Sequence, residues 1–339
     1  MKRLLFSVLL AAGLLCGCGA KDASAQIFAM DTVMNLTLYG EGTEASGQEV
    51  LGTAVGWLYD IEGELSVTKE NSDIHNINAN SGKNVDVSDD TAGLLADTLT
   101  LCEKTGGAMD ITAYPIVKAW GFTTGEYRVV PEEERSELVK RVGFENVSLD
   151  GTSVSLPEGM ELDLGAVAKG YAGDVLVSGL KQAGITSALL DLGQSTIAAV
   201  GTKPDGKPFR IGIQDPHGDT YLGVLELNDQ SMGSSGNYQR YFEENGVKYG
   251  HILDPDTAAP ADSGLAGVTV VSDSAFLCDG LSTALFVMGL EEAADYWREN
   301  RNFEAIFIEE NGNITITAGL RDDFKLQVDQ QHREVTVLE

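Results

Sequence analysis

The sequence Asp163-Leu164-Gly165-Ala166-Val167-Ala168-Lys169-Gly170 places an acid, two glycines and a lysine where an extended segment is predicted to become a helix. Glycine lets the backbone approach a ligand closely, and the first N–H groups of a helix favour anions. A lysine adds a compact positive charge that suits a phosphate. The stretch therefore predicts a diphosphate site at a helix start, although a helix-capping Asp163 and a solvated Lys169 would give the same pattern.

Acidic residues dominate the composition, with 52 Asp and Glu against 23 Lys and Arg and a formal net charge of -29. This excess repels polyanions, so it argues against nucleic acid as a partner and against attachment to anionic lipid through charge. A small anionic ligand would need a local lysine or a bound cation. Lys169 meets the first of these needs.

The N-terminus carries two basic residues and then an apolar run, Leu4 to Leu15. This run is shorter than the roughly 20 residues of a spanning helix, and the pattern is typical of an export signal. The following Leu15-Cys16-Gly17-Cys18 resembles a bacterial lipobox. We therefore expect residues 1–17 to be a signal peptide, Cys18 to carry lipid, and residues 18–26 to tether the protein to the extracytoplasmic face of the cell membrane. An ordinary cleaved signal is the alternative.

Two further cysteines, Cys102 and Cys278, lie far apart in the chain. Both fall in apolar helical patterns, which favours buried thiols over a disulfide framework. The sequence has no Cys-x-x-Cys motif and no Cys/His spacing of a zinc site.

Helices and mostly antiparallel strands are interleaved without regular βαβ units, which favours an α+β fold. Residues 27–339 are expected to form one domain in which helices pack on largely antiparallel sheets. Helices are predicted at Glu49–Leu65, Ser72–Asn78, Asp89–Lys104, from Pro131, at Ala166–Gln182, and at Ser274–Met288 with Gly289 as its stop. Strands are predicted at Phe28–Leu38, Ala188–Val200, Phe209–Gln214 and Gly223–Leu227. Hairpins are predicted across Asp150-Gly151 and Asn311-Gly312.

Asp279 and Thr283 are four residues apart on the predicted helix 274–288, so they share one helix face. Their neighbours are apolar or small, and a buried carboxylate costs free energy unless it is paired or bound to an ion. Such oxygen donors suit Mg²⁺, which often shares phosphate oxygens. Gly280 costs about 1 kcal/mol relative to Ala in mid-helix, a cost that a close backbone approach would explain. A buried Asp–Thr hydrogen bond is the alternative.

His251 is one of four histidines and alternates with Ile252 at the edge of a predicted strand. Its imidazole could accept a proton from a hydroxyl near neutral pH, because an unperturbed histidine has a pKa of about 6.5. Asp254, before Pro255, could orient the ring or simply start a turn. A hydrogen-bonded structural histidine is the alternative.

Asp110 follows Gly106-Gly107 just after a predicted helix end. Two glycines before an acid suit a loop that wraps a ligand, but also a turn acid that caps the next segment. Trp120 and Phe122 follow closely, and this aromatic pair could either stack on a flat ring or pack in the core.

Six motifs occur in order along the chain. They are Met30-Asp31-Thr32, Gly107-Ala108-Met109-Asp110-Ile111-Thr112, Asp163-Leu164-Gly165-Ala166-Val167-Ala168-Lys169-Gly170-Tyr171, Ser235-Gly236-Asn237-Tyr238, His251-Ile252-Leu253-Asp254-Pro255 and Asp279-Gly280-Leu281-Ser282-Thr283-Ala284-Leu285. Together they resemble the FAD:protein FMN transferases of the ApbE family, from about Phe28 to the C-terminus. Many members of that family are exported lipoproteins.

The resemblance implies an α+β flavin-transferase domain that binds FAD as a substrate in a cleft, with Mg²⁺ at its diphosphate. The metal would be held by the side chains of Asp279 and Thr283 and by the main-chain carbonyl of Ala166. His251 matches the base that activates a threonine hydroxyl, whose oxygen attacks the FMN phosphate while AMP leaves. The flavin-contacting positions of the family match Met30, Ala108, Met109, Asp110, Asp163, Lys169 and Ile252.

The implied partner is an exported or membrane-bound redox protein that carries the acceptor threonine. Two alternatives remain. A metal-dependent FAD pyrophosphatase would use water as the acceptor and give FMN and AMP. A non-catalytic FAD-binding lipoprotein would bind FAD without chemistry.

The chain departs from the family pattern at two places. The usual Leu-Gly-Gly-Asn reads Leu192-Gly193-Gln194-Ser195, and the usual Asp-Pro-x-Thr-Gly-x-Pro has Ala258 in place of its glycine. Both departures concern loops expected near the flavin, so we expect them to affect efficiency or partner fit more than the class of reaction.

Overall fold

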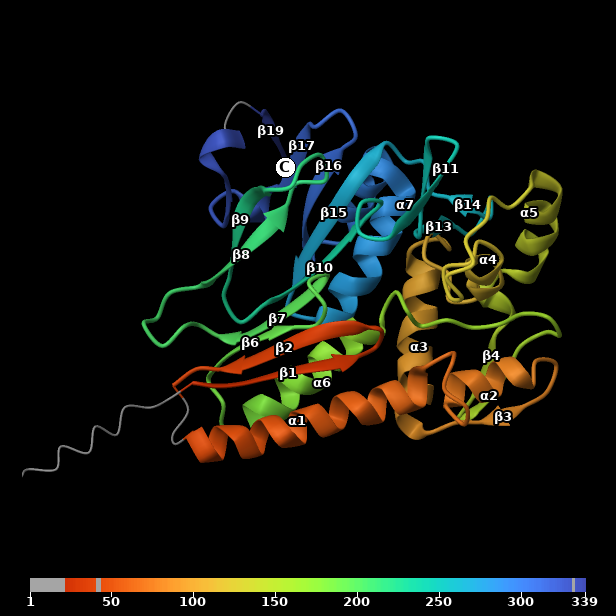
Figure 1. Ribbon diagram of the computed structural model, residues 1–339, viewed down its shortest axis with the longest axis horizontal. Helices are drawn as coiled ribbons and strands as arrows, with labels where there is room; N and C mark the ends of the chain where they lie inside the picture. Colours follow the sequence, from red (N-terminus) through yellow and green to blue (C-terminus); the bar gives the residue numbers. More distant parts are fainter. Residues whose placement is uncertain (1–21, 41–43, 331–332) are drawn as a thin grey trace, which may run out of the picture.

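The computed structural model describes residues 22–40, 44–330 and 333–339. Its centre is a nine-stranded sheet in the order β1-β2-β6-β7-β10-β15-β16-β17-β19 (Figure 1). Neighbouring strands are antiparallel except for the parallel pair β17–β19. The strands are β1 (Ala23–Ala29), β2 (Thr32–Leu38), β6 (Ser187–Asp191), β7 (Thr196–Gly201), β10 (Ser231–Gly236), β15 (Leu265–Ser272), β16 (Glu304–Glu309), β17 (Ile314–Thr317) and β19 (Val335–Leu338). The predicted α+β class with largely antiparallel sheets is confirmed.

Helices cover one face of this sheet and a smaller sheet covers the other. α7 packs on β10 and β15, α6 packs on β7 and α7, and α1 lies along β1 (Figure 1). The opposite face, with Ile197, Val271 and Ile306, packs on the three-stranded sheet β18-β9-β8. The helices are α1 (Glu44–Leu65), α2 (Asp73–Ala79), α3 (Asp89–Lys104), α4 (Tyr114–Ala119), α5 (Glu132–Leu138), α6 (Ala168–Gln182) and α7 (Ala275–Glu299). The strands of the smaller sheet are β8 (Phe209–Gln214), β9 (Tyr221–Leu227) and β18 (Phe324–Leu326).

The helices α2 to α5 gather at one end of the large sheet (Figure 1). α3 has its predicted bounds because its ends are marked locally. Ser88 accepts a hydrogen bond from the Thr91 N–H at the N-terminus, and Gly106, with φ 61°, follows the last turn. The remaining short elements are β3 (Val85–Asp86), β4 (Ser148–Asp150), β5 (Ser153–Ser155), β11 (Tyr241–Glu244), β12 (Val247–Gly250), β13 (Leu253–Asp254), β14 (Ala259–Pro260), η1 (Val139–Arg141), η2 (Phe144–Asn146), η3 (Ala318–Leu320) and η4 (Val328–Gln330).

Two segments that were each predicted as a single strand contain two strands joined by a turn. The segment 28–38 turns at Met30 and Asp31, whose φ angles are 50° and 60°, and the segment 188–200 turns at Gly193 and Gln194, with φ angles of 89° and 66°. The predictions were wrong because the first turn lacks glycine and the second carries only one, so the apolar pattern hid both reversals.

The N-terminal boundaries also differ from the prediction. β1 begins at Ala23, so the last residues of the segment 18–26, expected to be a tether, pair with β2. α1 begins at Glu44, earlier than the predicted Glu49, because its polar first turn also lies against β1. A Cβ atom on Gly47 would lie 2.7 Å from that of Ala23.

The predicted signal peptide 1–17 and the lipid site Cys18 lie outside the described residues. Within the described part of the chain, none of the helices combines the length and the hydropathy needed to span a bilayer. Cys102 and Cys278 are free and buried, as predicted.

Candidate active site

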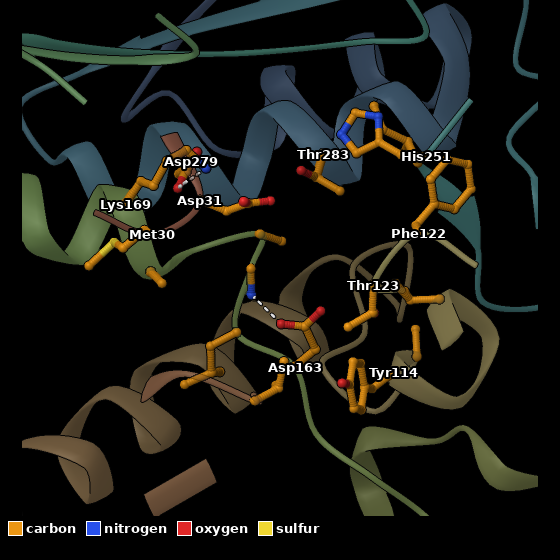
Figure 2. A pocket seen from close by; sticks show the side chains of 18 of the residues that line it. Met30, Asp31, Tyr114, Phe122, Thr123, Asp163, Lys169, His251, Asp279 and Thr283 are labelled. Atoms are coloured by element: carbon orange, nitrogen blue, oxygen red, sulfur yellow. Dashed lines mark hydrogen bonds and ion pairs between the residues drawn. The ribbon is translucent and has the colours of Figure 1, made fainter. Parts of the chain in front are cut away.

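A cavity of about 660 Å³ is lined by the first residues of α6, by Asp279 and Thr283 of α7, and by residues of α4. Its volume is within the range of roughly 300–1,000 Å³ that is typical of small-molecule sites. Figure 2 shows Lys169 beside Asp279, with Thr283 and His251 farther along the same side of the cavity, and Asp163 across from them. The predicted site residues that line it are Met30, Ala108, Met109, Asp110, Asp163, Ala166, Lys169, His251, Ile252, Asp279 and Thr283.

The helices α6 and α7 meet in close backbone contact. A Cβ atom on Gly170 would lie 2.3 Å from the Ala275 carbonyl oxygen, so the crossing requires glycine. Asp174 on α6 fixes the same crossing, because its carboxylate accepts the N–H groups of Ala275 at 2.6 Å and Phe276 at 3.1 Å. These contacts bring the start of α6 against the turn of α7 that carries Asp279.

Asp279 is 5% exposed, and three groups hold its carboxylate. Oδ2 accepts the Gly170 N–H at 2.9 Å and lies 3.7 Å from Lys169 Nζ. Oδ1 accepts the Thr196 hydroxyl from β7 at 2.9 Å. The alternative of an isolated Asp279–Thr283 hydrogen bond is therefore wrong, since the partners come from α6 and β7.

This arrangement leaves the Ala166 carbonyl available to the cavity. In a regular helix the Gly170 N–H would bond to that carbonyl, but here it bonds to Asp279. As a result α6 begins at Ala168 instead of the predicted Ala166, and no described residue donates a hydrogen bond to the Ala166 carbonyl. The Asp279 carboxylate, the Thr283 hydroxyl and this carbonyl are the hard oxygen donors that Mg²⁺ and Ca²⁺ prefer, so the donor set fits the predicted metal.

Gly280 lies in closer contact with side chains than with any backbone, which differs from the expectation. A Cβ atom there would lie 2.5 Å from Leu101 Cδ2 and 3.1 Å from Val167 Cγ1, so the neighbours are side chains and not a backbone. The close backbone approach predicted for Gly280 occurs at Gly170 instead.

Acidic side chains outnumber basic ones in the lining of the cavity. The carboxylates are those of Asp31, Glu62, Asp110, Asp163 and Asp279, and the cationic side chains are those of Lys69, Lys169 and Arg240. An anionic ligand would therefore be stabilised by a divalent cation. No group of three or more His, Cys, Asp and Glu residues within the described chain is arranged to hold a metal ion, and the candidate donors above are mostly of other types.

Asp110 uses its carboxylate to hold its own loop. Oδ1 accepts the N–H and the hydroxyl of Thr112 at 2.7 and 2.6 Å, and Oδ2 accepts the Phe144 N–H at 3.0 Å. Burial raises the pKa of Asp110 despite these bonds. Asp110 is therefore a turn acid, but it does not cap the next helix, because α4 has Ala113 at its cap position without a side-chain cap bond; Asp110 also lines the cavity.

Asp163 does not cap α6. Its Oδ1 accepts the Gly165 N–H at 2.8 Å, and the cap position of α6 is Val167, which has no side-chain cap bond. Burial raises the pKa of Asp163, while the Gly165 N–H and the charges of Lys169 and Arg240 oppose that rise. The carboxylate thus shapes the loop that leads into α6.

The Arg240 carbonyl holds His251 in place. That oxygen accepts both the backbone N–H and the ring Nδ1–H of His251 at 3.0 Å. Because a carbonyl can only accept, Nδ1 carries the proton and Nε2 keeps its lone pair in the neutral ring. Burial, with the charges of Arg240 and Lys169, lowers the pKa of His251 to about 4, although the carbonyl bond opposes this. The base form therefore persists far below the expected pKa of about 6.5.

Asp254 starts a turn and does not orient His251. Its carboxylate accepts the Asp256 N–H at 2.8 Å and the Thr257 hydroxyl at 3.0 Å. Nearby, Ala258 has a φ of 50°, and its carbonyl accepts the indole N–H of Trp120 at 2.8 Å.

Trp120 and Phe122, the predicted aromatic pair, both pack in the core, and Phe122 also reaches the cavity. Trp120 and Phe122 are both 2% exposed and belong to one apolar cluster with α4 and α5. Only Phe122 also lines the cavity, and its ring centroid lies 6.3 Å from that of His251, edge to face.

Sequence reasoning missed Arg240 and Thr196, which hold His251 and Asp279. A signal for Arg240 was present, because Asn245-Gly246 is a strong hairpin signature. Pairing outward from it joins Tyr241 to Gly250, as observed, and sets Arg240 opposite His251. No local signal connects Thr196 to Asp279, because their contact depends on how β7 packs under α7.

The fold and the cavity together define the class of ApbE-like α+β proteins. The structure is similar to that of the ApbE protein of Thermotoga maritima, with a TM-score of 0.83 and 29% identity over 89% of this chain and 99% of that one. It is also similar to the flavinyl transferase ApbE of Pseudomonas stutzeri in its apo form, with a TM-score of 0.80 and 30% identity over 91% and 98% of the two chains.

Sequence comparison identifies the family within that class. Residues 30–307 match the ApbE family, and the chain belongs to this family. The FAD:protein FMN transferase of Haemophilus influenzae is 34% identical over 273 residues, covering 76% of this chain and 78% of that protein. The FAD:protein FMN transferase of Treponema pallidum is 31% identical over 335 residues, covering 91% and 92%.

Proposed function

We propose that this protein transfers the FMN moiety of FAD to a threonine hydroxyl of a partner redox protein and releases AMP. The threonine oxygen forms a bond to the phosphorus of the FMN half. The bond from that phosphorus to the bridging oxygen breaks, and AMP leaves with this oxygen. The threonine proton passes to His251, and the product is a phosphoester on the partner.

The observation that carries this proposal is the neutral His251 ring on the same side of the cavity as Lys169, Asp279 and Thr283. Its Nε2 is free to accept a proton, because the Arg240 carbonyl occupies Nδ1. Proton transfer by a positioned base contributes typically 10²–10⁴-fold to a rate. A binding protein without chemistry would not need such a base beside its anion site.

Asp279, Thr283 and the Ala166 carbonyl would hold Mg²⁺, with Lys169 supplying a second positive charge. When bound, the metal neutralises charge on the phosphates, and positioning with charge neutralisation is most of phosphoryl-transfer catalysis. Met30, Ala108, Met109, Asp110, Asp163 and Ile252, which line the same cavity, are the proposed flavin contacts.

An FAD pyrophosphatase with water as acceptor, and FAD storage without chemistry, remain as competing functions. To separate them, the protein is incubated with FAD, Mg²⁺ and either a threonine-bearing acceptor peptide or the same peptide with valine. Mass spectrometry of the peptide and of the nucleotides should show FMN on the threonine peptide only, with an equal amount of AMP. Free FMN with AMP and no modified peptide would establish the pyrophosphatase, and intact FAD would establish storage.

We further propose that the protein is anchored by lipid on Cys18 to the extracytoplasmic face of the cell membrane. There it would meet exported or membrane-bound redox proteins. The support is the sequence of residues 1–18 alone. Cys18→Ser should release the protein or leave it unprocessed, as measured by membrane fractionation and intact mass. A wild-type protein without lipid mass in the soluble fraction would contradict the anchor.

A further inference from the structure

Three hydroxyl groups form a row between β10 and α7. Ser282, which is fully buried, donates a hydrogen bond to the Asp279 carbonyl oxygen at 2.9 Å. Its oxygen lies 2.8 Å from Ser235 Oγ, and Ser235 Oγ lies 3.3 Å from Thr283 Oγ1. Gly233 lets β10 approach so closely, because a Cβ atom there would meet the backbone of α7 at 2.5 Å.

The direction of each proton in this row follows from its fixed end. The Asp279 carbonyl can only accept a hydrogen bond, so the single hydroxyl hydrogen of Ser282 is donated to it. Ser235 must then donate to Ser282, which uses the one proton of Ser235. The longer contact at 3.3 Å can therefore be a hydrogen bond only if Thr283 donates to Ser235. In that case the hydrogen of the Thr283 hydroxyl is directed at Ser235 Oγ, and the lone pairs of the Thr283 oxygen remain for a ligand.

We infer that Ser282 and Ser235 are positioning residues that turn the Thr283 hydroxyl into an oxygen donor for a divalent cation. This inference rests on the cation site of the proposed function. A cation coordinates a hydroxyl through its lone pairs, so a hydroxyl whose hydrogen faced the cavity would have to rotate before it could bind. Groups that orient a metal ligand typically change metal affinity by 10–100-fold when they are removed.

Ser282 can affect Thr283 only through Ser235, so the inference predicts a specific pattern of cation affinities in single and double variants. In Ser282→Ala, Ser235 loses its acceptor and can donate to Thr283 instead, so that the Thr283 hydrogen is no longer directed at Ser235 and a lone pair of Thr283 is occupied. In Ser235→Ala, Thr283 loses its acceptor directly. Each variant should weaken cation affinity about tenfold. The double variant should be no weaker than Ser235→Ala alone, because Ser282 acts on the cation only through Ser235.

The experiment titrates the purified protein with Mn²⁺, which favours the same oxygen donors as Mg²⁺, and follows free Mn²⁺ by electron paramagnetic resonance with and without FAD. Thr269→Val is the matched control. Thr269, on the neighbouring strand β15, forms a similar but only partly buried hydroxyl pair with Ser234 of β10 at 2.8 Å, and its hydroxyl forms no hydrogen bond with the three described residues of the row, so its loss should leave Mn²⁺ affinity unchanged. Thermal melting of each variant separates loss of folding from loss of affinity.

The outcomes divide clearly. A tenfold loss in both single variants with no further loss in the double variant supports the relay. Wild-type affinity in Ser282→Ala, or losses that multiply in the double variant, overturns it. Asp279→Ala is measured beside them, and unchanged Mn²⁺ affinity in that variant would overturn both the cation site and the relay. Because Mn²⁺ binding needs no acceptor peptide, absence of FMN transfer alone would count against the proposed function and leave this result standing.

Discussion

The cavity has two sides that are built differently. Asp279 and Lys169 lie at a helix crossing, where Asp279 is almost fully buried and is held by groups from α6 and β7. His251 lies between an exposed hairpin and a short turn, and among the described residues its ring has the Arg240 carbonyl as its hydrogen-bond partner. The difference suggests a division of labour. Under the proposed function, the helix side would bind the charged ligand and the hairpin side would present His251 as the base to the acceptor.

The largest expected effect is on the helix side. Asp279→Ala should reduce FMN transfer below detection and weaken FAD binding at ordinary Mg²⁺, because a buried anchor of Gly170 and Lys169 is lost together with the charged metal donor. Product mass and FAD fluorescence measure the two effects. Asp229→Ala is the control, since Asp229 also pairs with a lysine, Lys181 at 2.8 Å, and accepts a glycine N–H at 2.8 Å, both outside the cavity lining. Full activity of Asp279→Ala in the presence of chelator would contradict the role.

The hairpin side should fail in a different way. His251→Ala should lower transfer by roughly 10²–10⁴-fold, the usual contribution of a general base, while FAD affinity stays near the wild-type value. Transfer rates at saturating FAD and binding by fluorescence separate the two. His217→Ala removes a histidine that also bonds to a carbonyl, Glu309 at 3.1 Å, and should change neither quantity. Transfer at the wild-type rate in His251→Ala would show that His251 is a structural residue and that the hairpin side does not supply the base.

Lys169 tests whether the helix side holds the diphosphate. Lys169→Ala should weaken FAD affinity by about ten- to a hundredfold, from the roughly 1.5–3 kcal/mol of a hydrogen bond to a charged group. The effect should appear at subsaturating FAD and shrink at saturation. Lys181→Ala, on the same helix but paired with Asp229, should bind FAD normally. Equal FAD affinities of Lys169→Ala and Lys181→Ala would show that Lys169 does not bind the FAD diphosphate.

The pH dependence of the His251 ring gives a second test of the hairpin side. The lowered pKa of about 4 means that the free His251 ring is neutral at higher pH and loses its base form only as the pH falls through that value. Nitrogen NMR of the ring should therefore show an Nδ1–H neutral tautomer unchanged from pH 7 to about 5. A titration centred near 6.5, the ordinary value, would show that burial does not depress the pKa of this histidine.

The smallest effect is expected at Ala258, where the chain departs from the glycine of the family pattern. Its φ of 50° costs an alanine about 1–2 kcal/mol, but glycine would lose about 0.5–1 kcal/mol in entropy and a buried methyl of about 0.8 kcal/mol. Ala258→Gly should therefore change the free energy of unfolding by less than about 1 kcal/mol, as measured in urea. A loss above about 2 kcal/mol would show that the turn beside Trp120 depends on that methyl group.

The sequence predicted those parts of the fold that carry local marks. α3 was correct at both ends because a capping serine and two glycines bound it, and the hairpins at Asp150-Gly151 and Asn311-Gly312 carry their own turn signatures. The turn at Met30 and Asp31 was missed because non-glycine residues adopt positive φ there. Its shape is imposed by the pairing of β1 with β2, which no local signal announces.

For the site as well, the sequence predicted residues with local motifs but not the contacts that depend on packing. The ordered motifs selected residues that the structure brings to one cavity, although the motifs lie in loops, at a strand end and within α7. The partners of Asp279 were not predictable, since Thr196 and Gly170 meet its carboxylate only once three separate elements are packed. The depressed pKa of His251 depends on burial and could not be obtained from neighbouring residues in the chain.

The Arg240 carbonyl has one more consequence, because it accepts the backbone N–H and the imidazole of His251 together. A local opening of the β11–β12 hairpin that moves the Arg240 carbonyl away breaks both bonds together. Hydrogen–deuterium exchange at the His251 amide would then report the fraction of time in which the base is out of alignment. A partner that slows this exchange on binding would be tightening the catalytic geometry, and the effect could be measured before any chemistry takes place.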